Sequence, residues 1–565
     1  MIDLRMLLTA GLGLMAFWMI PMVVQASPEM TERARKFVAA HEAKIRPLEH
    51  AASLAWWNAN VTGKDEDFEK KVEAQNRIDE ALADRDKFRD LKEIKESGQV
   101  DDPIVARQVN VLYLQYLEKQ VDPALLKQIV AKSNAVEKAF NVFRAKVDGK
   151  EMTDSQVRKV LKESKNSERL QAVWEASKAI GGLVEADLKE LVKLRNEAAH
   201  KLGFKNFHAM QLYLNEQDTD ELIKLFDSLD ELTRGPFRAA KEEIDAKLAA
   251  AYGITADQLR PWHYHDPFFQ ETPAVFAADI DEPFRQADLI KLTRDFYAGI
   301  GLPVEDVIAR SDLFERAGKS PHAFCTDIDR AGDVRVLANV VPNNYWMATL
   351  LHEFGHSVYS SKNIPQSKPY VLRMESHILT TEGVAMMFER LAKRRAWLEK
   401  MGGKVANGAA FDAAASKMLR YQLLVFSRWC QVMLRFEKAM YENPNQDLNK
   451  LWWDLVEKYQ MVHRSPGRNA PDYASKIHIV SAPVYYHNYM MGELFASQVH
   501  HAIARDVMHD ADPATVIYVG DKAVGDFMKK RVFEPGRSLL WNDLTRHATG
   551  EGLNPRAFAA DFKEK

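Results

Sequence analysis

Apolar residues recur at spacings of three and four over most of this chain, and this helical periodicity constrains the fold more than any other feature. The pattern is clear in residues 219–226 (Thr-Asp-Glu-Leu-Ile-Lys-Leu-Phe) and continues almost unbroken from about residue 27 to 254. Prolines at 261, 267, 273 and 283 mark a loop region, after which helical texture returns and reaches the C-terminus. The clearest strand-like run, residues 334–341, is rich in β-branched residues and ends at Pro342. The sequence therefore predicts a mostly α fold with a small sheet.

The composition fits a large globular body. The 565 residues are 46% hydrophobic and 28% charged, and the formal net charge of −3 gives no basic face for a nucleic acid. Cys325 and Cys430 are the two cysteines of the sequence, and both stand in apolar surroundings. We expect buried free thiols rather than a disulfide framework.

The N-terminal segment differs from the rest of the chain. Residues 1–26 contain Arg5, a long apolar stretch and a Val-Gln-Ala ending, which together are typical of a secretory signal peptide. A retained membrane anchor is the alternative, because the stretch approaches spanning length. No second segment is apolar enough to span a bilayer, so we expect no stable membrane span after removal of the signal. The expected location is the periplasm or the extracellular space.

The sequence His-Glu-Phe-Gly-His at 352–356 lies in a run with helical texture. A spacing of four puts His352 and His356 on one helix face, where both imidazoles can bind one zinc ion. Glu353 lies beside the metal without binding it and can take the proton from a water molecule there. This arrangement indicates a zinc metallopeptidase with one zinc ion per chain.

Zinc needs a third protein ligand, and two downstream acids are candidates. Glu375 is the first, and Glu382 is favoured because it opens a helix whose next turns are apolar. Glu389, two turns further on, faces the same way and is a candidate hydrogen-bond partner for a ligand histidine. A solvent-exposed role beside Arg390 is the alternative for Glu389.

The chain resembles the angiotensin-converting-enzyme family of dipeptidyl carboxypeptidases, and it is similar to the related thimet-type and F-type oligopeptidases. The resemblance extends over the whole mature chain. Its motifs, besides the histidine pair, are Ala-Ala-Ser-Leu-Ala-Trp-Trp-Asn-Ala-Asn-Val-Thr at 51–62, Pro-His-Ala at 321–323, Lys-Ile-His-Ile at 476–479, Tyr-His-Asn-Tyr at 486–489 and Gln-Val-His-His-Ala at 498–502.

The resemblance implies a single two-lobed peptidase domain over residues 27–565, of the gluzincin type, with a deep central channel and a lid of N-terminal helices. The small sheet would lie beside the metal-binding helix. Such a channel admits short unfolded peptides as substrates. The run at 334–341 would supply an edge strand on which an extended peptide can lie.

The resemblance also implies roles for residues outside the metal motif. His478 and Tyr489 would stabilise the oxyanion, and His322 and Ala323 would hold the substrate. Lys476 and Tyr486 match the family's ligands for the terminal carboxylate of a peptide. Gln270 is the one candidate for the glutamine that joins them, although its flanking sequence aligns poorly.

The reading as a peptidyl-dipeptidase leaves two alternatives. Glu382 lies 26 residues after His356, and Glu389 follows seven later, a pattern closer to the oligopeptidases, which cut inside peptides. Lys476 and His322-Ala323 favour the carboxydipeptidase. A catalytically inactive peptide-binding protein is the remote alternative, against which the intact Glu353 argues. The sequence does not indicate the natural peptide or the oligomeric state.

Overall fold

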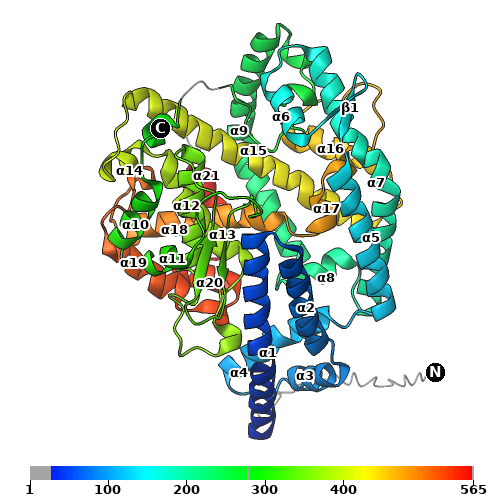
Figure 1. Ribbon diagram of the computed structural model, residues 1–565, viewed down its shortest axis with the longest axis vertical. Coiled ribbons are helices and arrows are strands. Elements are labelled where there is room, and N and C mark those ends of the chain that lie inside the picture. Colours follow the sequence, from blue (N-terminus) through cyan, green and yellow to red (C-terminus); the bar gives the residue numbers. More distant parts are fainter. Residues whose placement is uncertain (1–26, 276–278, 563–565) are drawn as a thin grey trace, which may run out of the picture.

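The computed structural model describes residues 27–275 and 279–562 and is built mainly of helices (Figure 1). The expected signal peptide, residues 1–26, lies outside the described residues. Among the described residues, no helix is both long enough and apolar enough to cross a membrane.

The first four helices pack around a small core that they share with the distant segment Tyr370–Leu372. They are α1 (Pro28–Thr62), α2 (Asp65–Leu82), α3 (Arg85–Ser97) and α4 (Pro103–Glu118). Ser27 caps α1 by accepting a hydrogen bond from the backbone N–H of Met30. Leu91, Val109 and Leu112 are buried in this core. In Figure 1, α1 and α2 run side by side at the lower centre of the molecule.

A second run of helices follows, interrupted by a hairpin that the periodicity did not predict. The elements are α5 (Pro123–Val142), β1 (Ala145–Val147), β2 (Lys150–Met152), α6 (Asp154–Glu163), α7 (Ser167–Lys201), α8 (Phe207–Leu214) and α9 (Thr219–Tyr252). The strands β1 and β2 pair antiparallel. Three residues per strand are too few for the alternation of sides to be visible in the sequence.

The middle of the chain contains the histidine motif and a small sheet. Its elements are α10 (Leu289–Gly299), α11 (Glu305–Arg310), β3 (Phe324–Asp327), β4 (Val334–Leu337), α12 (Asn344–Val358), α13 (Ile378–Glu389), a 3-10 turn η5 (Arg390–Lys393) and α14 (Arg395–Lys400). In Figure 1, α12, α13 and α18 overlap at the left centre, and α13 contacts both α12 and α18.

The C-terminal part completes the helical body. Its elements are α15 (Gly408–Glu442), α16 (Leu448–Gln460), the 3-10 turn η6 (Asp472–Ser475), α17 (His478–Ser481), α18 (His487–Asp506), the 3-10 turn η7 (Pro513–Thr515), α19 (Lys522–Phe527), α20 (Trp541–Thr549) and α21 (Arg556–Ala560). One continuous core runs from Val136 to Phe562 and includes residues of α12, α13, α15 and α18. The mostly α fold predicted from the periodicity is therefore confirmed.

The small sheet lies beside the motif helix, as expected, but its edge is not the predicted one. The strand β4 is shorter than the run at 334–341, and it pairs antiparallel with β3. The other side of β4 is bonded to the segment 311–313, where Asp312 donates to the carbonyl oxygen of Val336 and accepts from the N–H of Ala338. The prediction of an edge strand at 334–341 was wrong, because this pairing leaves β3 as the outer strand.

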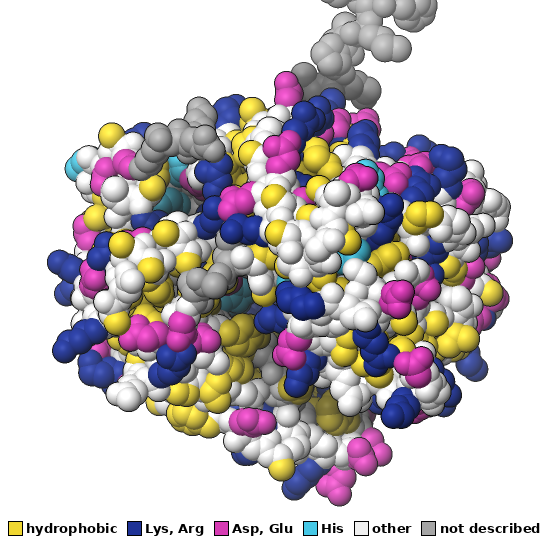
Figure 2. All heavy atoms as spheres, turned by 90° about the horizontal axis from the view of Figure 1, so that it is seen from above, with side chains coloured by type: hydrophobic (Ala, Val, Ile, Leu, Met, Phe, Trp, Pro, Cys, Tyr) yellow, Lys and Arg dark blue, Asp and Glu magenta, His cyan; other side chains and the backbone are white. Residues whose placement is uncertain are grey.

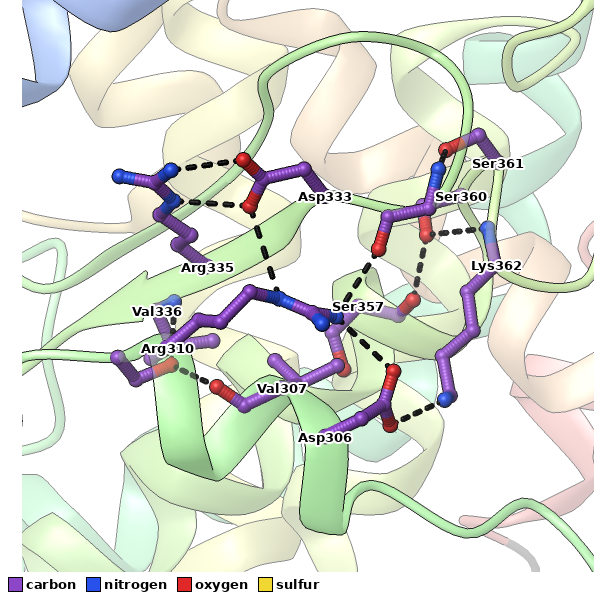
Figure 3. Close-up of polar contacts among 12 residues, drawn as sticks. Asp306, Val307, Arg310, Asp333, Arg335, Val336, Ser357, Ser360, Ser361 and Lys362 are labelled. Atoms are coloured by element: carbon purple, nitrogen blue, oxygen red, sulfur yellow. Dashed lines mark hydrogen bonds and ion pairs between the residues drawn. The ribbon is translucent and has the colours of Figure 1, made fainter.

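A polar network ties the C-terminal end of α12 to α11 and β4 (Figure 3). Asp306 of α11 pairs with Arg310 and with Lys362, and Arg310 lies 3.6 Å from Asp333. Asp333 in turn holds Arg335 of β4 at 2.7 Å. These links fix the end of the helix that contains the histidine pair.

The face of the molecule seen in Figure 2 shows basic and acidic side chains mixed together, without a broad region of one sign. This distribution agrees with the small formal net charge.

Candidate active site

Helix α12 brings the two motif histidines together. Asn343 caps the helix by accepting from the N–H of Trp346 at 2.8 Å, and Leu351 and Phe354 are fully buried. The Nε2 atoms of His352 and His356 lie 3.1 Å apart. Both rings therefore point at a common position on one side of the helix.

Glu382 of α13 completes this cluster. Its Oε2 atom lies 3.6 Å from Nε2 of His352 and 3.9 Å from Nε2 of His356. In a tetrahedral zinc site with bonds of about 2.0–2.1 Å, ligand atoms are about 3.3 Å apart. Within the described residues, these three side chains form the one group that could hold a metal ion. The donor set and its spacing fit a single divalent metal.

In each histidine, Nδ1 faces away from the cluster and is hydrogen bonded. This bond fixes the orientation of the ring, so that Nε2 points into the cluster. Nδ1 of His352 lies 2.9 Å from Oε2 of Glu389, and Nδ1 of His356 lies 2.8 Å from Oγ1 of Thr381. The carboxylate of Glu389 can only accept, so this contact places the proton of His352 on Nδ1 and leaves the lone pair of Nε2 for a metal. The Thr381 hydroxyl can accept from Nδ1 of His356 in the same way. Glu389 thus lies where the helical spacing predicted. Thr381 was missed, because no spacing in the sequence indicates which residue of α13 lies against His356.

Two glycines allow the helices to approach closely enough to form the cluster. A Cβ atom at Gly355 would lie 2.8 Å from Cα of Ala385, and one at Gly383 would lie 2.7 Å from the carbonyl oxygen of Gly492. Side chains at these positions would push α12, α13 and α18 apart. The glycine inside the histidine motif therefore has a packing role.

Glu353 lies beside the cluster in a buried position. Burial raises the pKa of its carboxyl to about 7, against the opposing charge of His352, and the backbone of Cys325 is hydrogen bonded to it. Cys325 belongs to β3, so the carboxylate lies between the outer strand and the histidine pair. Cys325 and Cys430 are free thiols, as expected, although Cys325 is only partly buried.

The rival acid Glu375 lies elsewhere. It lines a cavity of about 650 Å³ together with Glu49, Asp327 and Arg330, between α1, α2 and β3. It is absent from the group of residues that could bind a metal. The geometry therefore favours Glu382.

Three residues expected to bind a carboxylate meet in space, although they are far apart in sequence. Nζ of Lys476 donates to Oε1 of Gln270 at 2.7 Å, and the Tyr486 hydroxyl lies 3.5 Å from the same oxygen. The Lys476 ammonium also lies 5.1 Å from the ring centres of Phe268 and Trp429. Burial lowers the pKa of Lys476 to about 8, against the charge of Asp266.

We call Gln270, Lys476 and Tyr486 the carboxylate-binding cluster. A row of aromatic rings leads from it towards the metal-ligand cluster. The rings of His478 and Tyr486 are 5.3 Å apart, and those of Tyr486 and Tyr489 are 5.6 Å apart. Burial, with the nearby Glu382 carboxylate, raises the pKa of Tyr489. Nδ1 of His478 is buried and has no hydrogen-bond partner among the described residues, and burial lowers its pKa to about 4. His478 is the first residue of α17.

His322 and Ala323 lie directly before β3. His322 is exposed, and its backbone N–H donates to the Ser320 hydroxyl at 3.3 Å. No hydrogen bond or ion pair joins either residue to the metal-ligand cluster among the described residues. Their position continues the outer strand of the sheet.

Taken together, the helical fold and a His-His-Glu cluster with an adjacent buried glutamate define a metallopeptidase. Residues 28–235 match the family model described as angiotensin-converting enzyme, and residues 308–564 match the model described as peptidase family M3. The chain is a metallopeptidase related to both families, and its metal-ligand cluster lies in the part matched by peptidase family M3. A comparison with curated proteins gives no match.

Proposed function

We propose that this protein is a zinc peptidyl-dipeptidase, which releases dipeptides from the C-termini of short peptides. The observation that carries the proposal is the cluster of Lys476, Gln270 and Tyr486, connected through ring contacts to the residues around the metal. A buried ammonium with an amide and a phenol beside it suits a terminal carboxylate. We further propose that residues 27–565 form a single two-lobed peptidase domain, exported after removal of residues 1–26.

His352, His356 and Glu382 would hold one zinc ion, since their donor atoms converge at suitable spacing. When bound, zinc supplies a Lewis acid that polarises the scissile carbonyl and lowers the pKa of a water molecule. Glu353 takes the proton from this water and returns it to the leaving amine. Its buried position beside the histidine pair supports this role.

Tyr489 and His478 are the proposed donors to the oxyanion that develops on the carbonyl oxygen. The raised pKa of Tyr489 keeps its hydroxyl protonated, and the lowered pKa of His478 keeps its ring neutral with one N–H to donate. Removing one such donor typically costs about 2.7–4 kcal/mol of transition-state stabilisation. The substrate would lie along β3, held by His322 and the backbone of Ala323.

An oligopeptidase that cuts inside peptides is the second candidate. The spacing of Glu382 and the contact between Glu389 and His352 favour it, because the sequence resembles the oligopeptidases at these positions. Such an enzyme would not read the terminal carboxylate, and Lys476 would then have only a structural role.

A tripeptide with a blocked N-terminus and a free C-terminus tests the proposal. We expect the zinc-loaded enzyme to release its C-terminal dipeptide, to contain one zinc ion per chain, and to lose activity with a chelator. Active protein free of zinc, or a zinc enzyme that leaves this tripeptide intact while cutting longer peptides internally, would refute the proposal.

A further inference from the structure

A second cavity lies against α13 and η5, away from the helix face that carries Glu382 and Glu389. Glu382 and Glu389 are seven residues apart and share one face of α13, whereas Met387, which lines the cavity, lies on the opposite side of that helix. The cavity has a volume of about 490 Å³, within the range of small-molecule sites. Its walls come from α13, η5, α14, α15, α18, η7 and the C-terminal residues.

The cavity is lined by more positive than negative side chains. Four arginines face it, at positions 390, 394, 395 and 420, against the two acids Asp412 and Asp561. His500 also lines the cavity, but burial lowers its pKa to about 4, so its ring is neutral at pH 7. The lining therefore carries an excess of positive charge.

Two of the four arginines are neutralised by acids. Arg390 pairs with Glu493 and donates to Ser497, and Arg395 pairs with Asp412 at 2.7 Å. Even so, the Nε atom of Arg390 is buried without a hydrogen-bond partner among the described residues.

The other two arginines have donors to spare. Arg394 donates to the backbone carbonyl oxygen of Ala514 and forms no ion pair within 4.0 Å among the described residues, and burial lowers its pKa. Arg420 makes neither a hydrogen bond nor an ion pair with any described residue. Each guanidinium group is a planar fork that matches the two oxygens of a carboxylate.

The remaining walls are apolar. Leu419 and Leu423 of α15 lie one turn apart and line the cavity, as do Leu391, Val516 and Phe562. An apolar surface next to two arginines that form no ion pair with a described residue suits a ligand with an anionic head and an apolar body.

We propose that this cavity is a second binding site, which takes an organic carboxylate with an apolar body through Arg394 and Arg420. Two sources share this chemistry: a fatty acid and the C-terminus of an apolar peptide. This site is separate from the carboxylate-binding cluster at Lys476, because the two share no residue. The inference does not depend on the proposed reaction.

Isothermal titration calorimetry on the zinc-loaded full chain tests the inference with decanoate and N-acetyl-Leu-Leu as probes. We expect Arg394→Gln with Arg420→Gln to weaken binding of the tighter probe at least tenfold, and the probe that binds tighter identifies the source. Decanol, which has the same body without the charge, should bind far more weakly than decanoate.

Three variants keep the result interpretable. Arg77→Gln removes an exposed arginine of α2 and should leave binding unchanged, and so should Lys450→Ala, which removes an exposed lysine of α16. Ser416→Trp would fill the cavity from α15 and should abolish binding, which retains the test if the double arginine variant fails to fold. Unchanged affinity in the folded double variant, or equal affinity for decanol and decanoate, would overturn the inference.

Discussion

At the scale of single residues, the chemistry depends on where protons are held. The structure assigns each histidine of the pair an outer hydrogen-bond partner, so that both Nε2 atoms face inward. Glu353 has no such partner on the side chain of any described residue and lies buried next to them. This difference separates the metal ligands from the proposed general base.

Glu353→Gln should retain zinc and lose at least about three decades of turnover, because general base catalysis contributes roughly 10²–10⁴-fold. The change keeps the shape of the side chain and removes its ability to accept a proton. Steady-state kinetics and elemental analysis of the same preparation check this expectation. Turnover near that of the unsubstituted enzyme would show that another group is the base.

The lowered pKa of Lys476 predicts a pH dependence of substrate recognition. Lysine binds a carboxylate only in its charged form, which is present below a pKa of about 8 and is lost as the pH rises through it. The ratio of kcat/KM for a free-acid peptide to that for its amide should therefore fall above pH 8. Groups around the metal that gain or lose a proton change kcat/KM equally for both substrates, so their effect cancels in this ratio. A ratio that stays constant from pH 6 to 10 would contradict the assigned role.

At the scale of elements, α13 supplies a metal ligand and the outer partners of both histidines. Glu382 completes the cluster, Thr381 contacts His356, and Glu389 contacts His352. The three side chains share one helix of twelve residues, so its position relative to α12 fixes the whole site. Gly355 and Gly383 allow that close approach.

Thr381→Val should weaken zinc binding about 10–100-fold, because the ring of His356 loses the partner that fixes it. Thr349→Val is a matched control, since Thr349 is a half-buried residue of α12 whose hydroxyl donates to the carbonyl oxygen of Tyr345 in its own helix. Competition with a chromogenic chelator measures both variants. Equal zinc affinities for the two would show that the Thr381 contact has no effect on the metal.

The sequence predicted those parts of the site that depend on spacing within one helix. Spacing along a helix determines which residues share a face. His352 and His356 are four apart, and Glu382 and Glu389 are seven apart, so both pairs were predictable. Thr381 escaped notice because a threonine contact depends on how two helices cross. The edge of the sheet was assigned wrongly because β4 pairs with residues 311–313, whose sequence has no strand pattern.

At the scale of the whole molecule, the site combines segments that are distant in the chain. Gln270 lies in a loop and meets Lys476 across 206 positions, a contact that only resemblance suggested beforehand. Helix α1 packs against the outer strand, where the rings of Trp56 and Phe324 lie 4.2 Å apart. A peptide bound along β3 would therefore lie beneath α1.

The central claim is that the enzyme measures its cut from the terminal carboxylate of the substrate. The most direct test is mass spectrometry of the products from one peptide, supplied as the free acid and as the C-terminal amide. We expect dipeptides to leave in sequence from the free acid, and the amide to react about ten to a hundred-fold more slowly, since a charge-assisted contact worth about 1.5–3 kcal/mol is lost. Lys476→Ala should remove the preference without loss of zinc, whereas Lys450→Ala, at an exposed lysine, should retain it. Internal cuts at equal rates in acid and amide would contradict the account and identify an oligopeptidase.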